Sequence, residues 1–130
     1  MAVRVLVVDD AAFMRMMVKD ILSKNGYEVV GEAENGMKAL EKYQELKPDL
    51  TTMDITMPEM DGIETANRIR ELEDSYYKDV PIIALTANAI NGAREMFIEE
   101  GMNDFIAKPI SMKELSDKIL EWLPFELLQE

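Results

Sequence analysis

The sequence predicts an α/β fold in which helices cover both faces of a five-stranded parallel sheet. Short apolar segments rich in β-branched residues alternate with segments whose apolar residues recur at helical spacing. No repeat or low-complexity stretch interrupts this alternation. Because crossovers between parallel strands are right-handed and parallel sheets are buried on both faces, the alternation favours a doubly wound sheet. We expect the strand order 2-1-3-4-5 and five helices.

Five segments have the length and composition of buried parallel strands. Each is short and apolar or β-branched, and polar or turn-forming residues bound it. The polar stretch 71–79 is expected to be a plain connection between the third helix and the fourth strand. The strands are expected at residues 3–8, 28–33, 50–53, 80–85 and 103–107.

Five amphipathic helices are expected in the connections. Asn25-Gly26 supplies a left-handed stop for the first helix, Asn35-Gly36 introduces the second, and Gly101 stops the fourth. The apolar stripes run through residues 13–22, 37–46, 63–72, 90–97 and 115–123.

Length and composition predict one compact domain. With 130 residues and 48% hydrophobic content, the chain can bury a full core. We expect this domain to span residues 1–124, followed by a short C-terminal tail, 125–130. No apolar run approaches the roughly 20 residues that span a bilayer, and no signal-peptide pattern is seen. We therefore expect a cytoplasmic protein. Separately, we expect it to be a monomer.

Charge and missing residue types limit the possible functions. The 14 basic and 26 acidic residues give a formal charge of −12, which opposes binding to nucleic acid or to an anionic membrane surface. The chain has no cysteine and no histidine. These absences exclude Ser-His and Cys-His nucleophile systems and ordinary zinc sites, so carboxylates, hydroxyls and lysines must carry any chemistry.

Acidic residues follow two of the expected strands. Asp9 and Asp10 come after the first strand, and Asp54 comes after the third, where its carboxylate is expected to be exposed. Thr86 and Lys108 follow the fourth and fifth strands. Since ligands bind beyond the carboxyl ends of parallel strands where the strand order reverses, we expect these side chains to share one site.

Crowded carboxylates of this kind predict a magnesium site. Each pair repels by up to about 4 kcal/mol at roughly 4 Å in an effective dielectric near 20. Mg²⁺ would offset the repulsion, because it prefers one or two carboxylates together with waters and phosphate oxygens, and Mn²⁺ is an expected substitute. With Lys108 and the Thr86 hydroxyl, such a site would hold a phosphoryl group in line with Asp54 as the attacking carboxylate.

Four short blocks stand in order at the ends of strands one, three, four and five. They are Val7-Val8-Asp9-Asp10, Met53-Asp54-Ile55-Thr56-Met57-Pro58, Leu85-Thr86-Ala87 and Phe105-Ile106-Ala107-Lys108-Pro109. Together they resemble the signature of response-regulator receiver domains, over roughly residues 3–123. The resemblance implies the flavodoxin-like, CheY-like form of the fold.

The resemblance also implies roles for the acidic residues. Asp54 would be the phosphoacceptor, with Lys108 beside it. The metal would be held by Asp54, by Asp10, by the backbone carbonyl of Thr56 and, largely through water, by Asp9.

Thr86 and Phe105 complete the switch that the resemblance implies. Their movement would reshape the face formed by the fourth helix, the fifth strand and the last helix, where a downstream protein would bind. The phosphoryl donor would be a histidine kinase or a histidine phosphotransfer protein.

The two halves of the chain resemble different receivers. Residues 9–17 and 52–58 look closest to chemotaxis receivers of the CheY type. Residues 81–88 and 103–110 are more like receivers fused to hybrid sensor kinases. A spliced or engineered chain is therefore a hypothesis.

Each site residue also has a simpler interpretation when it is taken alone. Asp9, Asp10 and Thr86 could cap helices, Asp54 could begin a turn, and Lys108 could be an ordinary surface lysine. Only their combination favours a functional site.

We interpret the chain as a phosphorylation-dependent signalling switch. We expect it to catalyse its own phosphorylation and dephosphorylation and no other reaction, so it is not an enzyme in the usual sense. A phosphatase of the haloacid dehalogenase class is one alternative, but it needs an Asp two positions after the nucleophile, where this chain has Thr56. A flavin carrier would place Asp9 and Asp10 against the flavin phosphate. An unphosphorylated scaffold is the third alternative.

The start of the first helix has more apolar residues than one buried stripe needs. These residues are Phe13, Met14, Met16, Met17 and Val18. We predict that some face outward and dock the phosphodonor protein, because methionine surfaces adapt to partners. The alternative is a set of scattered surface side chains without a function.

Overall fold

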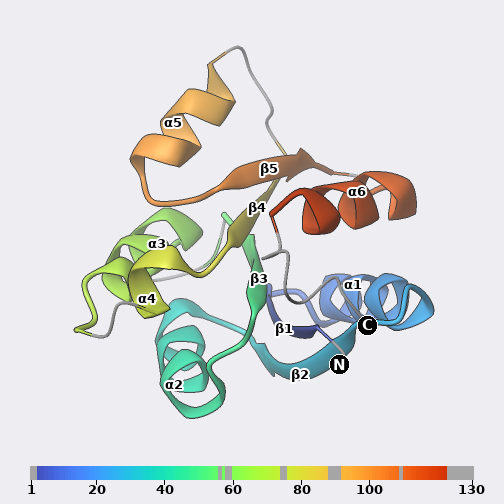
Figure 1. The fold of residues 1–130 in the computed structure, drawn as a ribbon, viewed down its shortest axis with the longest axis horizontal. Coiled ribbons are helices and arrows are strands. Elements are labelled where there is room, and N and C mark those ends of the chain that lie inside the picture. The colour runs from blue at the N-terminus through green and yellow to red at the C-terminus, as the bar shows by residue number, and fades with distance from the viewer. Residues whose placement is uncertain are drawn as a thin grey trace.

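A parallel sheet of five strands forms the centre of the molecule. The computed structural model describes residues 3–55, 57, 60–73, 76–87, 92–108 and 110–122. The strand order β2-β1-β3-β4-β5 confirms the prediction, with β2 and β5 at opposite edges of the sheet (Figure 1). The strands are β1 Arg4–Val8, β2 Glu28–Ala33, β3 Leu50–Asp54, β4 Ile82–Thr86 and β5 Asp104–Ala107.

Six helices lie within the described residues, whereas the sequence analysis predicted five. They are α1 Ala12–Lys24, α2 Gly36–Leu46, α3 Gly62–Arg70, α4 Tyr76–Asp79, α5 Ala93–Glu99 and α6 Met112–Trp122. The helices predicted as fourth and fifth therefore correspond to α5 and α6. None of the helices in these ranges is long and apolar enough to cross a membrane.

The additional helix is the single turn α4, in the polar stretch that was expected to be a plain connection. Tyr77 is buried against the core, and its ring packs edge-on against that of Tyr76, with 5.0 Å between the ring centroids. Burial of two aromatic side chains, rather than a periodic apolar stripe, positions this turn, so the sequence pattern did not reveal it.

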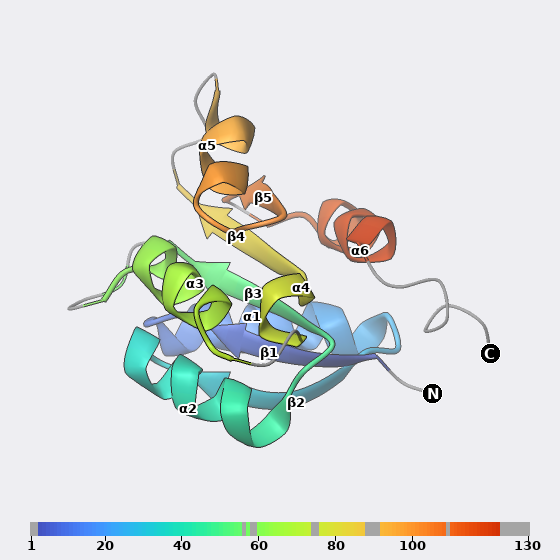
Figure 2. The same cartoon turned by 60° about the vertical axis from the view of Figure 1, so that its left-hand side comes forward.

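Two apolar cores lie on the two faces of the sheet, as a doubly wound fold requires. Helices α1 and α6 cover one face, and Val18, Leu22 and Leu115 belong to the core beneath them. Helices α2, α3, α4 and α5 contribute to the other core, which contains Tyr43 and Phe97 (Figures 1 and 2).

Strands β3 and β4 each continue one residue further than predicted. Asp54 is the last residue of β3 and lies opposite Leu85 in the parallel ladder. Thr86 is the last residue of β4 and lies opposite Ala107. Both polar side chains are therefore fixed by the sheet instead of being carried on a loop.

The predicted helix boundaries at two glycine-containing turns are confirmed. Gly26 follows α1 with a φ of +83°, the left-handed conformation that stops a helix, and Asn35 caps α2 by accepting a hydrogen bond from the Lys38 N–H at 2.9 Å. Helix α1 begins after Ala11 with no side-chain cap. The interpretation of Asp10 as a mere cap is therefore wrong.

Candidate functional site

The carboxyl ends of β1, β3, β4 and β5 bring the predicted site residues to one edge of the sheet. Asp9 and Asp10 directly follow β1, and Asp54 ends β3, whose register places Met53 opposite Val8. Lys108 directly follows β5, and its N–H donates to the carbonyl of Thr86 at 2.8 Å. Thr56 lies outside the described residues.

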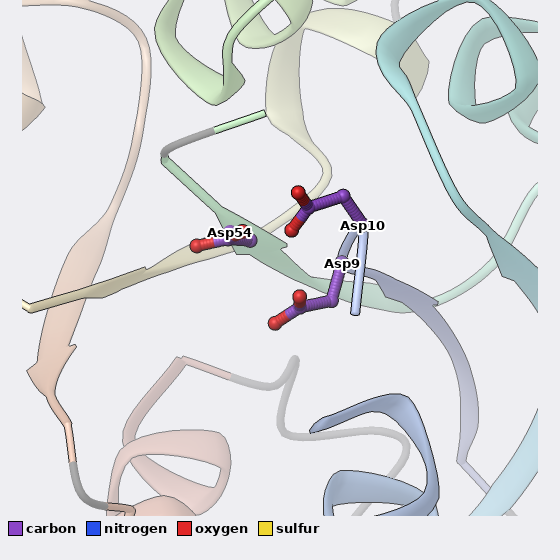
Figure 3. A group of neighbouring side chains, drawn as sticks. All are labelled: Asp9, Asp10 and Asp54. Carbon is purple, nitrogen blue, oxygen red and sulfur yellow. The ribbon is translucent and has the colours of Figure 1, made fainter. Parts of the chain in front are cut away.

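Three carboxylates from two strands form the centre of this site. One oxygen each of Asp9, Asp10 and Asp54 lies within 4.8 Å of the others. Figure 3 shows the three side chains converging from the end of β1 and the end of β3. Asp10 is exposed, whereas Asp9 and Asp54 are only 1% and 3% exposed. The expectation that Asp54 is exposed is therefore wrong, because the residue still belongs to β3.

Lys108 is the basic partner of the two buried carboxylates. Its Nζ donates to Asp54 Oδ1 at 3.0 Å and lies 3.7 Å from Asp9 Oδ2. The lysine side chain is half-buried, so the attraction between these charges is screened less than that of a surface pair. One ammonium group thus compensates part of the charge of two acids.

Burial dominates the titration of the buried acids. It raises the pKa of Asp54 to about 6, because the hydrogen bond from Lys108 lowers this pKa by less than burial raises it, and repulsion from Asp9 raises it further. The pKa of Asp9 is also raised, again mainly by burial, although the hydrogen bond from the Ala11 N–H acts in the opposite direction. Ionising both carboxyl groups is therefore costly in the protein alone.

The donor set fits a hard divalent cation. Asp9 Oδ1 accepts from the Ala11 N–H at 3.0 Å, but Asp9 Oδ2 is buried and has no hydrogen-bond partner among the described residues. Such an atom is costly unless something else satisfies it. A cation shared by Asp9, Asp10 and Asp54 would satisfy this oxygen and relieve the repulsion, and oxygen ligands of this kind suit Mg²⁺.

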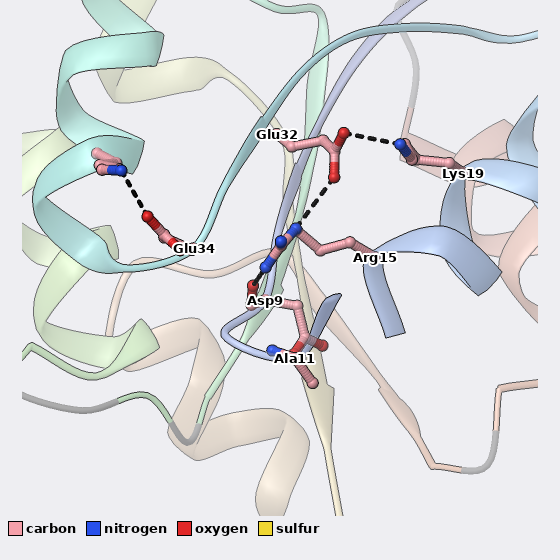
Figure 4. A network of polar contacts seen from close by, with 7 residues as sticks. Asp9, Ala11, Arg15, Lys19, Glu32 and Glu34 are labelled. Atoms are coloured by element: carbon pink, nitrogen blue, oxygen red, sulfur yellow. Dashed lines mark hydrogen bonds and ion pairs between the residues drawn. The ribbon is translucent and has the colours of Figure 1, made fainter. Parts of the chain in front are cut away.

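Arg15 is a supporting residue that the sequence analysis missed. Its Nη1 donates to the backbone carbonyl of Asp9 at 2.7 Å, and its Nε donates to Glu32 Oε1 at 3.0 Å (Figure 4). Lys19 donates to the other oxygen of Glu32 at 2.7 Å. Arg15 therefore ties the acidic loop after β1 to β2. Its helical position alone gave no indication of where its guanidinium reaches.

Gly62 is a second feature of the site that the sequence analysis did not single out. A Cβ at this position would lie 2.3 Å from the backbone oxygen of Asp54, and the Gly62 N–H donates to the Ile55 carbonyl at 2.9 Å. Only glycine allows the start of α3 to approach the end of β3 this closely. The punctuation of the loop by glycine was the available signal.

The two predicted switch residues lie on neighbouring strands. Thr86 is buried at the end of β4. Phe105 is half-buried on β5, opposite Ala84, and its ring centroid lies 5.7 Å from that of Phe97 in α5. Phe105 therefore contacts a helix of the face that is predicted to bind a downstream protein.

Comparison with known proteins assigns the family. The sequence profile of the response regulator receiver domain matches residues 5–120. The chain belongs to the response-regulator receiver family. Its sequence is 52% identical over 121 residues to the chemotaxis protein CheY of Bacillus subtilis (strain 168), covering 93% of this chain and 94% of that protein. It is thus similar to CheY over nearly the full length of both chains.

Two solved structures are similar to this fold. Vibrio cholerae CheY4 aligns with a TM-score of 0.86 and 32% identity, covering 95% of this chain and 100% of that one. CheY in the CheX-CheY-BeF₃-Mg complex of Borrelia burgdorferi aligns with a TM-score of 0.84 and 28% identity, covering 92% of this chain and 87% of that one. The chain is a CheY-like receiver domain of two-component signalling.

Proposed function

We propose that Asp54 accepts a phosphoryl group from a histidine kinase or a histidine phosphotransfer protein, and that this modification controls binding to a downstream protein. The observation that carries the proposal is the pairing of Asp54 with Lys108 inside a group of three carboxylates. A buried acid that is held by a lysine and crowded by two other acids has the surroundings of an activated nucleophile.

The transfer needs one bond to form and one to break. An oxygen of Asp54 attacks the phosphorus, the bond from phosphorus to the donor imidazole nitrogen breaks, and the electron pair stays with that nitrogen. With a pKa of about 6, Asp54 is mostly ionised at neutral pH and can act as the nucleophile. Lys108 then pairs with a phosphoryl oxygen, and the Thr86 hydroxyl donates to another.

The metal in this proposal is Mg²⁺, for which Mn²⁺ could substitute. Asp9, Asp10 and Asp54 would hold it, together with the carbonyl of Thr56. When bound, it would supply positive charge that neutralises the carboxylates and the phosphoryl oxygens. Arg15 keeps the acidic loop in place by holding the Asp9 carbonyl.

The output of the switch is proposed to be the face formed by α5, β5 and α6. Met96 and Ile98 are exposed apolar side chains of α5. Thr86 and Phe105 connect this face to the acidic site, since one ends β4 and the other packs against Phe97.

The donor is proposed to dock on the start of α1. Phe13 and Met16 are 65% and 57% exposed there, whereas Met14 and Met17 are half-buried and Met14 packs against the core. Phe13→Ser and Met16→Ser are therefore the changes that should slow transfer from a kinase. Unchanged transfer rates would contradict docking at this surface.

A mass measurement tests the proposed acceptor. Acetyl phosphate with Mg²⁺ should add one phosphoryl mass to the wild-type chain and none to Asp54→Ala. Asp117→Ala is a matched control, because Asp117 is an exposed acid of α6 that pairs only with exposed Lys113 in the described structure. A wild-type chain that gains no mass would favour the alternative of an unphosphorylated scaffold.

Several finer expectations belong to the same proposal. The chain would catalyse only its own phosphorylation and dephosphorylation, which separates it from the phosphatase alternative. A cytoplasmic monomer that binds neither nucleic acid nor membranes remains predicted. Separate origins of the two halves also remain a hypothesis, which would fail if each half, compared separately, proved closest to the same relatives.

A further inference from the structure

A buried carboxylate lies at the opposite end of β5 from Lys108. Asp104 begins β5 and is fully buried, although β5 is an edge strand of the sheet. The strand separates it from Lys108 by about 13 Å, since each residue of a strand advances roughly 3.3 Å. Asp104 is therefore not part of the acidic site.

Asp104 joins three elements of the molecule. Its Oδ1 accepts from the N–H of Phe105 at 2.8 Å, and its two oxygens accept from Lys118 Nζ at 3.0 and 2.9 Å. Its Oδ2 also accepts from Trp122 Nε1 at 2.9 Å and lies 3.9 Å from Arg94 Nη1. Lys118 and Trp122 belong to α6, and Arg94 belongs to α5. We call Asp104, Lys118, Trp122 and Arg94 the Asp104 cluster.

The hydrogen bonds of the Asp104 cluster stabilise the ionised form of the Asp104 carboxylate. Burial alone would raise the pKa of Asp104, but the hydrogen bonds from Trp122, Lys118 and the Phe105 N–H hold it below its ordinary value. An uncompensated charge in this position would be strongly unfavourable, whereas a fully hydrogen-bonded one fixes a single arrangement of its partners.

Phe105 and Asp104 attach the same strand to two different helices. Successive side chains of a strand point to opposite faces, and here Phe105 packs on Phe97 of α5 while Asp104 binds α6. Because the Asp104 carboxylate also accepts a hydrogen bond from the Phe105 backbone N–H, a shift of the β5 backbone at Phe105 would move the acceptor of Lys118 and Trp122.

We propose that Asp104 is a positioning residue that transmits a shift of the β5 backbone at Phe105 to α6. The proposal rests on the proposed function, because phosphorylation of Asp54 is the event proposed to shift Phe105. The consequence is that α6, in the face formed by α5, β5 and α6, responds to phosphorylation only when the Asp104 cluster is intact.

The chain carries its own reporter for this transmission. Trp122 is the only tryptophan, so its fluorescence reports on the Asp104 cluster without labelling. Hydrogen exchange of the α6 amides, which does not depend on the indole, gives a second readout.

The experiment measures Trp122 emission and α6 hydrogen exchange in the wild-type chain and in Asp104→Asn. Each protein is studied with and without beryllofluoride and Mg²⁺, which mimic the phosphoryl group. Labelling of each protein by acetyl phosphate is measured in parallel. In the wild type we expect the mimic to change both Trp122 emission and α6 exchange. In Asp104→Asn we expect both responses to be lost while the phosphoryl mass gain at Asp54 persists. Asp117→Asn, on the exposed side of α6, should respond as the wild type does.

The outcomes separate the two proposals. Full responses in Asp104→Asn, or a wild-type mass gain without any change in α6, would overturn the role of Asp104 alone. A wild type that gains no phosphoryl mass would overturn the proposed function and the transmission with it. If Asp104→Asn does not fold, the double variant Asp104→Asn with Lys118→Met, which leaves no unpaired lysine charge, carries the same test.

Discussion

The folded protein disfavours the ionised form of the Asp54 carboxyl group. Its pKa of about 6 lies above the ordinary value of 3.8, chiefly because burial disfavours the ion. Between these two pH values the folded chain binds more protons at Asp54 than the unfolded chain does. Its contribution to stability is therefore present below about pH 4 and is lost as the pH rises through about 6.

This direction of the pH dependence predicts how Asp54→Asn changes stability in the absence of divalent metal. The variant should be more stable than the wild type at pH 7.5 by about 1–3 kcal/mol, since one unit of pKa corresponds to about 1.4 kcal/mol. The gain should shrink as the pH falls towards 4. Urea unfolding with a chelator present, repeated across this range, measures the difference. A difference that does not vary with pH would contradict burial as the cause.

At the scale of the elements, the contact between α3 and β3 holds the acceptor in place. Gly62 starts α3 directly against the backbone of Asp54, where a Cβ would approach the Asp54 oxygen to 2.3 Å. In an ordinary helix, Gly→Ala stabilises by roughly 0.5–1 kcal/mol. Here we expect Gly62→Ala to destabilise by about 1–3 kcal/mol, because backbone atoms must move to make room.

The same change should also lower the rate of Asp54 phosphorylation by acetyl phosphate, since it displaces the backbone that carries the acceptor. Thermal unfolding and labelling rates measure the two effects. Arg68→Ala is a suitable control on the same helix, because its ion pair with Glu64 is exposed and should contribute under about 1 kcal/mol. Equal stability of Gly62→Ala and the wild type would show that the contact can relax.

The elements that the sequence predicted correctly are those with a strong local pattern. Apolar runs identified all five strands, and polar residues at their ends located the site. The sequence could not show that Asp54 is buried, since this depends on the ladder continuing through it and on Lys108 reaching across from β5. Helix α4 and the reach of Arg15 to Glu32 were missed for the same reason, because both depend on contacts between residues distant in sequence.

At the scale of the whole molecule, the net negative charge opposes the compact state. The formal charge of −12 makes the chain repel itself, and the three carboxylates of the site concentrate part of that repulsion. General screening by salt should stabilise the chain to some extent. A specific cation site should act in addition, because a ligand that binds only the folded state stabilises it by mass action.

Mg²⁺ should therefore raise the melting temperature beyond the effect of NaCl at equal ionic strength. At tenfold excess over the dissociation constant the gain is about 1.4 kcal/mol, which corresponds to roughly 5 °C for a chain of this size. Asp10→Ala should weaken this response but change the metal-free melting temperature little, because Asp10 is the exposed member of the three acids. Differential scanning calorimetry with and without Mg²⁺ measures both values. An undiminished response in Asp10→Ala would exclude Asp10 as a ligand, whereas a response that NaCl reproduces would mean that screening alone stabilises the chain.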